Sequence, residues 1–169
     1  MRTLSLDPGI AGTGWAMWCH ASTETAWRKI ELPLACGNLY PRGDNFIDRT
    51  QSITSELGQL IAIYHVGDVI CEFPEFFGDT AKGYAATSDG SIYKLAFFIG
   101  AVAELCSARG VQFQHVKVTE WKGQLPKDVM IRRIRDLLGG GLEVSLQPSV
   151  HAWDAIGIGL YAKGHRFYS

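Results

Sequence analysis

The sequence has no surplus of charge of either sign. Its 169 residues contain 16 lysines and arginines and 17 aspartates and glutamates, which gives a formal net charge of −1. This balance excludes a simple basic arm that binds nucleic acid by charge alone. Any affinity for nucleic acid must come from the arrangement of charges on a folded surface, because the total charge supplies none.

Long hydrophobic runs are also missing. No segment reaches the ~18 uninterrupted apolar residues that a membrane span requires, so we expect no contact with a membrane. The apolar residues near the N-terminus are interrupted by Asp7-Pro8-Gly9, unlike those of a signal peptide. With 47% hydrophobic and 20% charged residues, the composition is that of a soluble globular protein. The length predicts a single domain spanning residues 1–169.

Cysteine is scarce and unpaired in the sequence. The four cysteines lie 17, 35 and 35 residues apart, without a Cys-x-x-Cys pair or the Cys/His spacing of a zinc site. Each has apolar neighbours, which predicts buried, reduced thiols at Cys19, Cys36, Cys71 and Cys106. Reduced thiols indicate a cytoplasmic location, either with the nucleoid of a cell or in the host of a virus.

Hydrophobic periodicity predicts strands that alternate with helices. The expected strands are residues 3–7, 15–18, part of 25–39, 68–73 and 111–118. The expected helices are residues 45–64, 91–109, 126–138 and about 148–163, the last with Pro148 in its first turn. This order predicts an α/β fold: a central mixed sheet of three antiparallel strands and then two parallel strands, with helices on both faces.

Acidic residues occur in three elements that are otherwise apolar. Asp7 ends the first strand, Glu72 lies inside the strand at 68–73, and Asp154 lies in the final helix. His151 precedes Asp154 by three residues, so the two side chains share one helical face. Carboxylates are rarely buried unless they are paired or bind a metal. Gathered at one end of a sheet they would repel each other, and a divalent cation would relieve that repulsion.

Each of these residues alone has an ordinary structural explanation. Asp7 fits a turn, Glu72 fits an edge strand facing water, Asp154 fits an ion pair with a lysine or arginine, and His151 fits a hydrogen-bonded helical histidine. The combination is explained less easily in this way and favours a metal site. Oxygen ligands without paired cysteines suit Mg²⁺ or Mn²⁺ rather than zinc.

The three acid-bearing segments resemble those of a known enzyme family. LSLDPGIAGTGWAM, VICEFPEFF and SVHAWDAIGIGLYA, in this order from residue 3 to about 163, are similar to the RuvC family of Holliday-junction resolvases. The resemblance implies an RNase H-like fold and paired, metal-dependent cleavage of four-way DNA junctions that leaves 5′-phosphate and 3′-hydroxyl ends. It also implies that two Mg²⁺ or Mn²⁺ ions are held by Asp7, Glu72, His151 and Asp154.

One position departs from the commonest pattern of the family. His151 stands where many members have an aspartate, although histidine also occurs there. The site is therefore one unit less negative than in those members. Whether His151 binds metal or handles a proton stays open.

A basic segment and an aromatic loop are candidates for contact with DNA. Residues 116–135 contain six basic and two acidic residues, which suits a phosphate partner unless the segment is simply a solvated helix face. The resemblance implies that Lys122 and Lys127 assist the reaction. The loop after Glu72 has aromatics that either unstack bases or cap the core. The candidate DNA contacts are Lys117, Lys122, Lys127, Arg132, Arg133, Phe76, Phe77 and Tyr84.

A four-way junction has two symmetric strands to cut, so we expect a homodimer with paired sites. A helical stripe suits either the dimer contact or packing on the sheet, and consists of Ile92, Leu95, Ile99 and Val102. The alternatives to a resolvase are a nuclease of the same fold that cuts flaps, R-loops or forks, and a non-catalytic junction-binding module. An actin-like ATPase or sugar kinase is disfavoured, because its two-domain cleft exceeds this length.

Overall fold

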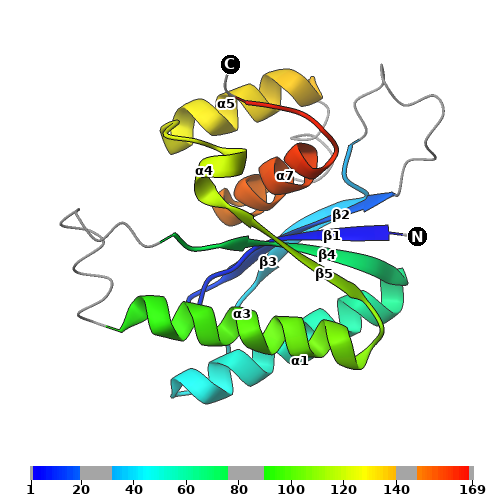
Figure 1. The fold of residues 1–169 in the computed structure, drawn as a ribbon, viewed down its shortest axis with the longest axis vertical. Helices are drawn as coiled ribbons and strands as arrows, with labels where there is room; N and C mark the ends of the chain where they lie inside the picture. Colours follow the sequence, from blue (N-terminus) through cyan, green and yellow to red (C-terminus); the bar gives the residue numbers. More distant parts are fainter. Residues whose placement is uncertain (1, 20–31, 76–89, 140–147, 168–169) are drawn as a thin grey trace.

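A single mixed sheet forms the centre of the molecule (Figure 1). The computed structural model describes residues 2–19, 32–75, 90–139 and 148–167. The strands are β1 (Arg2–Asp7), β2 (Thr13–Cys19), β3 (Ala35–Leu39), β4 (Val66–Phe73) and β5 (Gln112–Lys117), in the order β3-β2-β1-β4-β5. The pairs β3-β2 and β2-β1 are antiparallel, whereas β1-β4 and β4-β5 are parallel. The predicted strand arrangement is confirmed.

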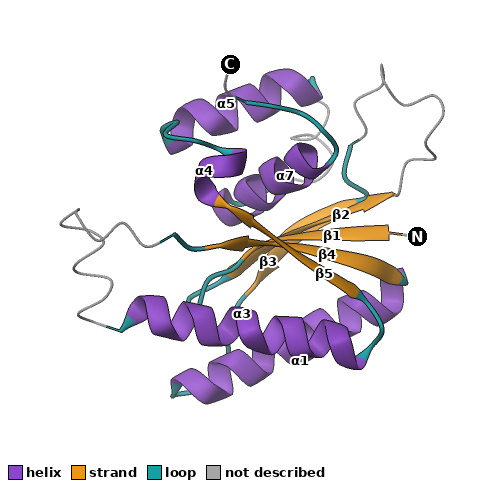
Figure 2. Cartoon of the chain, in the orientation of Figure 1, coloured by secondary structure: helices purple, strands orange, loops and turns teal. Residues whose placement is uncertain are grey.

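Helices cover both faces of this sheet, as predicted (Figure 2). The helices α1 (Phe46–Tyr64) and α3 (Ser91–Ala108) lie on one face. The other face carries α4 (Val118–Trp121), α5 (Lys127–Leu138) and α7 (Val150–Ala162). The four-residue helix α4 was not predicted from the sequence, which placed residue 118 in a strand.

Side-chain caps fix where two of the helices begin. Asn45 accepts a hydrogen bond from the backbone N–H of Asp48 at the start of α1. Ser149 accepts one from the backbone N–H of Ala152 at the start of α7. Because Ser149 is the N-cap residue, Pro148 precedes α7, and the prediction that it lies in the first turn is wrong.

Two hydrophobic cores lie on opposite sides of the sheet. The core beneath α1 and α3 is largely aliphatic and includes Leu4, Leu6, Ile53, Leu57, Ile61, Val69, Ile99 and Val102. The core beneath α7 is built around tryptophan rings and includes Trp18, Trp121, Trp153, Met130, Ile134 and Ile156. Every residue of α7 from 152 to 160 is buried, which makes this helix the centre of the second core.

Two glycines of α7 leave the space that two tryptophan rings occupy. A Cβ atom at Gly159 would lie 2.1 Å from Nε1 of Trp18, and one at Gly157 would lie 2.6 Å from a ring carbon of Trp121. These contacts are far below van der Waals distance. The glycines in the sequence GIG are therefore required by packing.

The inner face of α3 packs on the sheet. Ile99 and Val102 are buried in the aliphatic core, and Leu95 packs against it. Leu95, Ile99 and Val102 of the predicted stripe therefore pack on the sheet, whereas Ile92 is not part of this core. By length and composition alone α3 could cross a membrane, but in this fold it is the crossover helix between the parallel strands β4 and β5.

The cysteines are free, as expected, but they are not all buried. Cys71 and Cys106 are buried, whereas Cys36 is partly exposed and Cys19 is exposed. Cys19 is the last residue of β2, where apolar sequence neighbours do not guarantee a covered side chain. The prediction of a buried thiol is wrong for this residue.

Candidate active site

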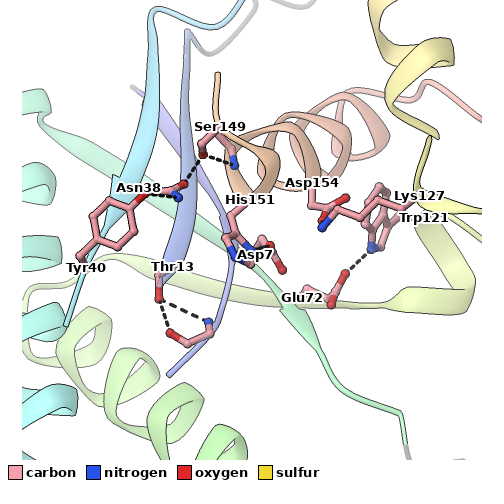
Figure 3. Close-up of polar contacts among 12 residues, drawn as sticks. Asp7, Thr13, Asn38, Tyr40, Glu72, Trp121, Lys127, Ser149, His151 and Asp154 are labelled. Atoms are coloured by element: carbon pink, nitrogen blue, oxygen red, sulfur yellow. Dashed lines mark hydrogen bonds and ion pairs between the residues drawn. The ribbon is translucent and has the colours of Figure 1, made fainter. Parts of the chain in front are cut away.

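Two neighbouring strands and one helix bring three acids to the same end of the sheet. Asp7 is the last residue of β1, and Glu72 is the last but one of β4. Because β1 and β4 are parallel neighbours, these two ends meet at one edge. Asp154 lies in α7, which packs across β1 and β2. Figure 3 shows the three acids together with His151 in this region.

The turn after Asp7 is fixed by its own hydrogen bonds and by close packing (Figure 3). The Thr13 hydroxyl donates to the carbonyl oxygen of Gly9 at 3.1 Å and accepts from the Gly9 N–H at 3.4 Å. A Cβ atom at Gly14 would lie 2.1 Å from the carbonyl oxygen of His151. The missing side chain lets β2 approach α7, which brings His151 to the end of β1.

His151 contacts Asp7. Its Nδ1 lies 3.2 Å from Oδ2 of Asp7, and its side chain is half exposed whereas that of Asp7 is 14% exposed. An exposed imidazole beside a largely covered carboxylate is accessible to solvent and to a ligand. Both open readings of His151, as a metal ligand and as a proton carrier, are compatible with this contact.

Asp154 contacts Lys127 and keeps one oxygen without a donor. Its Oδ2 lies 2.5 Å from Nζ of Lys127, and the aspartate side chain is 7% exposed. Its Oδ1 is buried and has no hydrogen-bond partner. Such an orphaned carboxylate oxygen needs an explanation, and an ion bound at this edge supplies one. The oxygen-rich donor set therefore fits Mg²⁺ or Mn²⁺.

Glu72 contacts a tryptophan that the sequence analysis did not single out. Its Oε2 accepts a hydrogen bond of 2.7 Å from Nε1 of Trp121 in α4. Lys122, the next residue, places Nζ 5.3 Å from the centroid of the Trp121 ring. The sequence WKG contains both residues, Trp121 and Lys122. Only the lysine was identified as a candidate from the sequence.

The acids are held by separate partners. Asp7 contacts His151, Asp154 contacts Lys127, and Glu72 contacts Trp121. Within residues 2–19, 32–75, 90–139 and 148–167, no three acidic, histidine or cysteine side chains form a ready metal cage. Mutual repulsion between carboxylates accounts for this separation. A bound cation would have to draw the side chains toward itself.

Burial and repulsion raise the pKa of two of the acids. Burial, and then the charge of Asp154, raise the pKa of Asp7 to about 6. Burial, and then the charge of Asp7, raise the pKa of Glu72 to about 7, although the hydrogen bond from Trp121 opposes this rise. Neighbouring carboxylic acids whose charged forms are disfavoured by burial, although Lys127 and Lys122 act in the opposite direction, are typical of a functional site.

A polar chain outside the acids ties α7 to the edge of the sheet. The Ser149 hydroxyl donates to Oδ1 of Asn38 in β3 at 2.6 Å, and Nδ2 of Asn38 donates to the hydroxyl of Tyr40 at 3.2 Å (Figure 3). Ser149 is the N-cap of α7, two residues before His151. These contacts join residues far apart in the sequence, so no local pattern revealed them.

The predicted basic residues have different surroundings. Lys127 and Lys122 lie close to the acids, and the charge of Lys122 acts on Glu72. Lys117 and Arg132 are exposed. Arg133 donates a hydrogen bond to the carbonyl oxygen of Phe167, a structural role that the sequence analysis missed. The predicted aromatic contacts lie outside the described residues: Phe76, Phe77 and Tyr84.

Known proteins show a similar sequence and fold. No family model matches the chain. The curated RuvC crossover junction endodeoxyribonuclease of Oleidesulfovibrio alaskensis is 26% identical over 145 residues, which cover 82% of this chain and 78% of the relative. Thermus thermophilus RuvC has a TM-score of 0.66 at 18% identity, over 97% of this chain and 96% of that chain. The fold is that of RuvC.

Two solved complexes extend this RuvC comparison. Thermus thermophilus RuvC with a Holliday junction substrate has a TM-score of 0.67 at 20% identity, over 97% of this chain and 96% of that chain. The Fowlpox virus resolvase with its substrate Holliday junction DNA has a TM-score of 0.59 at 13% identity, over 96% of this chain and 99% of that chain. The resemblance to RuvC and the RNase H-like fold that it implied are confirmed.

Proposed function

We propose that the chain is a metal-dependent, structure-selective DNA endonuclease that resolves Holliday junctions by paired hydrolysis of phosphodiester bonds. The observation that carries this proposal is the meeting of Asp7, Glu72 and Asp154 at one edge of a RuvC-like sheet. The RuvC relative and the solved complexes with junction DNA support the choice of substrate. The products are a 5′-phosphate and a 3′-hydroxyl.

The three carboxylates would hold the metal ions, with His151 as a further ligand or as a proton carrier. When bound, two Mg²⁺ or Mn²⁺ ions would neutralise charge on the scissile phosphate and lower the pKa of a water molecule. Asp7 is electrostatically coupled to both other acids, because its charge acts on Glu72 and the charge of Asp154 acts on Asp7. His151 would hold or release a proton at Nδ1, beside Asp7.

Two lysines supply positive charge at the same edge. Lys127 lies against Asp154, and Lys122 lies over the Trp121 ring close enough to act on Glu72. Fixed cations at this position stabilise the negative charge that develops on the phosphate during hydrolysis. The exposed Lys117 and Arg132 extend the basic surface along β5 and α5, where the DNA backbone would bind.

A second copy of the chain is the partner that we propose. Tyr93 and Phe97 of α3 are 66% and 53% exposed, and Ile47 of α1 is 47% exposed. The rings of Phe46 in α1 and Phe97 in α3 contact each other, with their centroids 5.4 Å apart. Exposed apolar side chains that adjoin each other mark an interaction surface. A homodimer formed there would provide the two sites that two symmetric strands require.

We place the enzyme in the cytoplasm, with the DNA on which it acts. That DNA belongs either to the nucleoid of a cell or to a virus in its host. The free cysteines are consistent with a reducing compartment.

The test is cleavage of a synthetic four-way junction in Mg²⁺ by the wild-type chain and by Asp7→Asn. We expect paired incisions with 5′-phosphate ends for the wild type, and binding without cleavage for the variant. Flap, R-loop and fork substrates of the same sequence serve as comparisons, and faster cleavage of these would favour the alternative nuclease. Cleavage that survives EDTA or Asp7→Asn would contradict the proposed site.

A further inference from the structure

Trp121 has a hydrogen bond that its own chemistry makes specific. Its side chain is 0% exposed, and its Nε1 donates to Oε2 of Glu72 at 2.7 Å. An indole N–H is a donor only and does not ionise in the accessible pH range. It therefore stabilises an acceptor oxygen of Glu72 in one orientation, and Figure 3 shows this contact between α4 and β4.

The position of the Trp121 ring is set by the core beneath α7. A Cβ atom at Gly157 would lie 2.6 Å from the ring and 3.0 Å from Cδ1 of Ile134. Ring, glycine and isoleucine therefore interlock without free space. A side chain packed in this way holds its N–H in place, because a shift of the ring requires repacking of the core.

The backbone also directs Trp121 toward Glu72. In the register of the sheet, Val116 of β5 is the partner of Glu72 in β4. The chain ends β5 at Lys117 and enters α4 directly, which places Trp121 at the end of a single helical turn. The short helix thus returns the indole to the strand end that carries Glu72.

We propose that Trp121 is a positioning residue, which fixes the carboxylate of Glu72 as a metal ligand by holding Oε2 and leaving the other oxygen to bind. This inference rests on the proposed function, which assigns Glu72 to the metal. Outer partners of ligand side chains typically contribute 10- to 100-fold to metal affinity. Trp121→Phe removes the N–H and retains an aromatic ring, so it weakens metal binding about tenfold or more.

The experiment is a titration of the metal-free protein with Mn²⁺, with free Mn²⁺ measured by electron paramagnetic resonance. The matched control is Trp18→Phe, because Trp18 is equally buried and its Nε1 donates to the Ser5 hydroxyl at 2.9 Å. We expect the Kd for Mn²⁺ to rise about tenfold or more in Trp121→Phe and less than about twofold in Trp18→Phe. Equal Kd values in the two variants would overturn the proposal.

A double variant separates positioning from a general loosening of the fold. In Glu72→Gln the tryptophan no longer orients a charged ligand, so adding Trp121→Phe changes the Kd by less than about twofold. The same tenfold loss in that background would contradict the proposed role. If Trp121→Phe does not fold, as judged by circular dichroism, Trp121→Leu removes the N–H and retains an apolar side chain, and an unchanged Kd there would also overturn the proposal.

The Mn²⁺ titration does not depend on cleavage, so the two proposals fail in different ways. A wild-type chain that does not cut junction DNA defeats the proposed function, and the titration still decides the role of Trp121. A wild-type chain that cuts, together with an inactive Glu72→Gln and an unimpaired Trp121→Phe at limiting Mn²⁺, defeats only the positioning role.

Discussion

The cores on the two sides of the sheet consist of different kinds of side chain. Beneath α1 and α3 the core is aliphatic, whereas beneath α7 it contains the buried rings of Trp18, Trp121 and Trp153. The second side also includes the buried acid Asp154 and the glycines that admit two of the rings. The aliphatic core therefore supplies stability alone, whereas the core beneath α7 combines packing with the placement of groups that repel each other.

The largest expected effect concerns an acid of the second side. We expect Glu72→Gln to reduce junction cleavage at least ~10³-fold, because it removes a charged ligand from a group of residues that act together. Single-turnover cleavage at saturating DNA measures this loss, and Glu104→Gln, which changes an exposed acid of α3 on the other side of the sheet, is the control. A reduction of similar size in the control would show that the change is not specific to the site.

Matched core substitutions sharpen the contrast between the two sides. Leu57→Ala and Ile134→Ala each remove a fully buried aliphatic side chain, so each should lower the free energy of unfolding by about 2–5 kcal/mol. Only Ile134→Ala is expected to weaken Mn²⁺ binding, since Ile134 packs beside Gly157 and the Trp121 ring. Urea unfolding and the Mn²⁺ titration together measure this, and equal Mn²⁺ affinities would remove the distinction.

The metal-free protein should lose stability as the pH rises. The folded-state pKa of Asp7 is raised from 3.8 to about 6 and that of Glu72 from 4.5 to about 7. Both groups therefore bind protons more tightly in the folded state, and the stability present below about pH 4 is lost as the pH rises through 6 and 7. For Glu72 the loss is of the order of 3 kcal/mol.

Urea unfolding in EDTA at pH 5 and pH 8 checks this expectation. The difference in the free energy of unfolding between the two pH values should be smaller in Glu72→Gln. It should also be smaller when Mg²⁺ is added in excess of the chelator, because the cation offsets the negative charge of the acids. Glu104→Gln, an exposed acid of α3, should leave it unchanged. A metal-free wild type that is more stable at pH 8 than at pH 5 would contradict the account of these acids.

The outer surface of the aliphatic side is expected to affect assembly rather than folding. Tyr93→Ser with Phe97→Ser removes exposed apolar side chains of α3, so a homodimer should dissociate at least about tenfold more readily while monomer stability changes little. Sedimentation equilibrium measures the dissociation constant. Lys94→Ser, another exposed position of the same helix, is the control. An unchanged dissociation constant would place the dimer contact elsewhere.

The smallest expected effect lies on the basic surface. Arg132 is exposed on α5, so Arg132→Ala should weaken junction binding modestly and reduce the slope of log K against log salt by about 1. Fluorescence anisotropy between low and moderate salt measures the slope. Arg49→Ala in α1, on the other side of the sheet, should leave the slope unchanged, and equal slopes for both variants would contradict a DNA contact at Arg132.

Sequence reasoning worked best where a pattern repeats along the chain. The helical stripe of α1 and the apolar strand around Glu72 were visible because burial imposes a period, and Asp7 and Asp154 stood out as acids in apolar elements. The helix α4 was not predicted, because four residues are too few to show a helical period. The contact of Trp121 with Glu72 depends on this helix and was missed for the same reason.

Contacts across long separations escaped for a different reason. The hydrogen bond between Ser149 and Asn38, and that between Arg133 and Phe167, depend on how elements pack, which local propensity does not encode. Cys19 was predicted buried because its sequence neighbours are apolar, yet it ends a strand and is exposed. Roles set by tertiary position therefore require the folded structure.

The most direct measurement is the anomalous difference density of a crystal of this protein soaked in Mn²⁺. We expect manganese bound by carboxylate oxygens of Asp7, Glu72 and Asp154, with Lys127 withdrawn from the oxygen that it now contacts. Well-diffracting crystals without manganese at this edge, or with manganese bound only elsewhere on the protein, would contradict it.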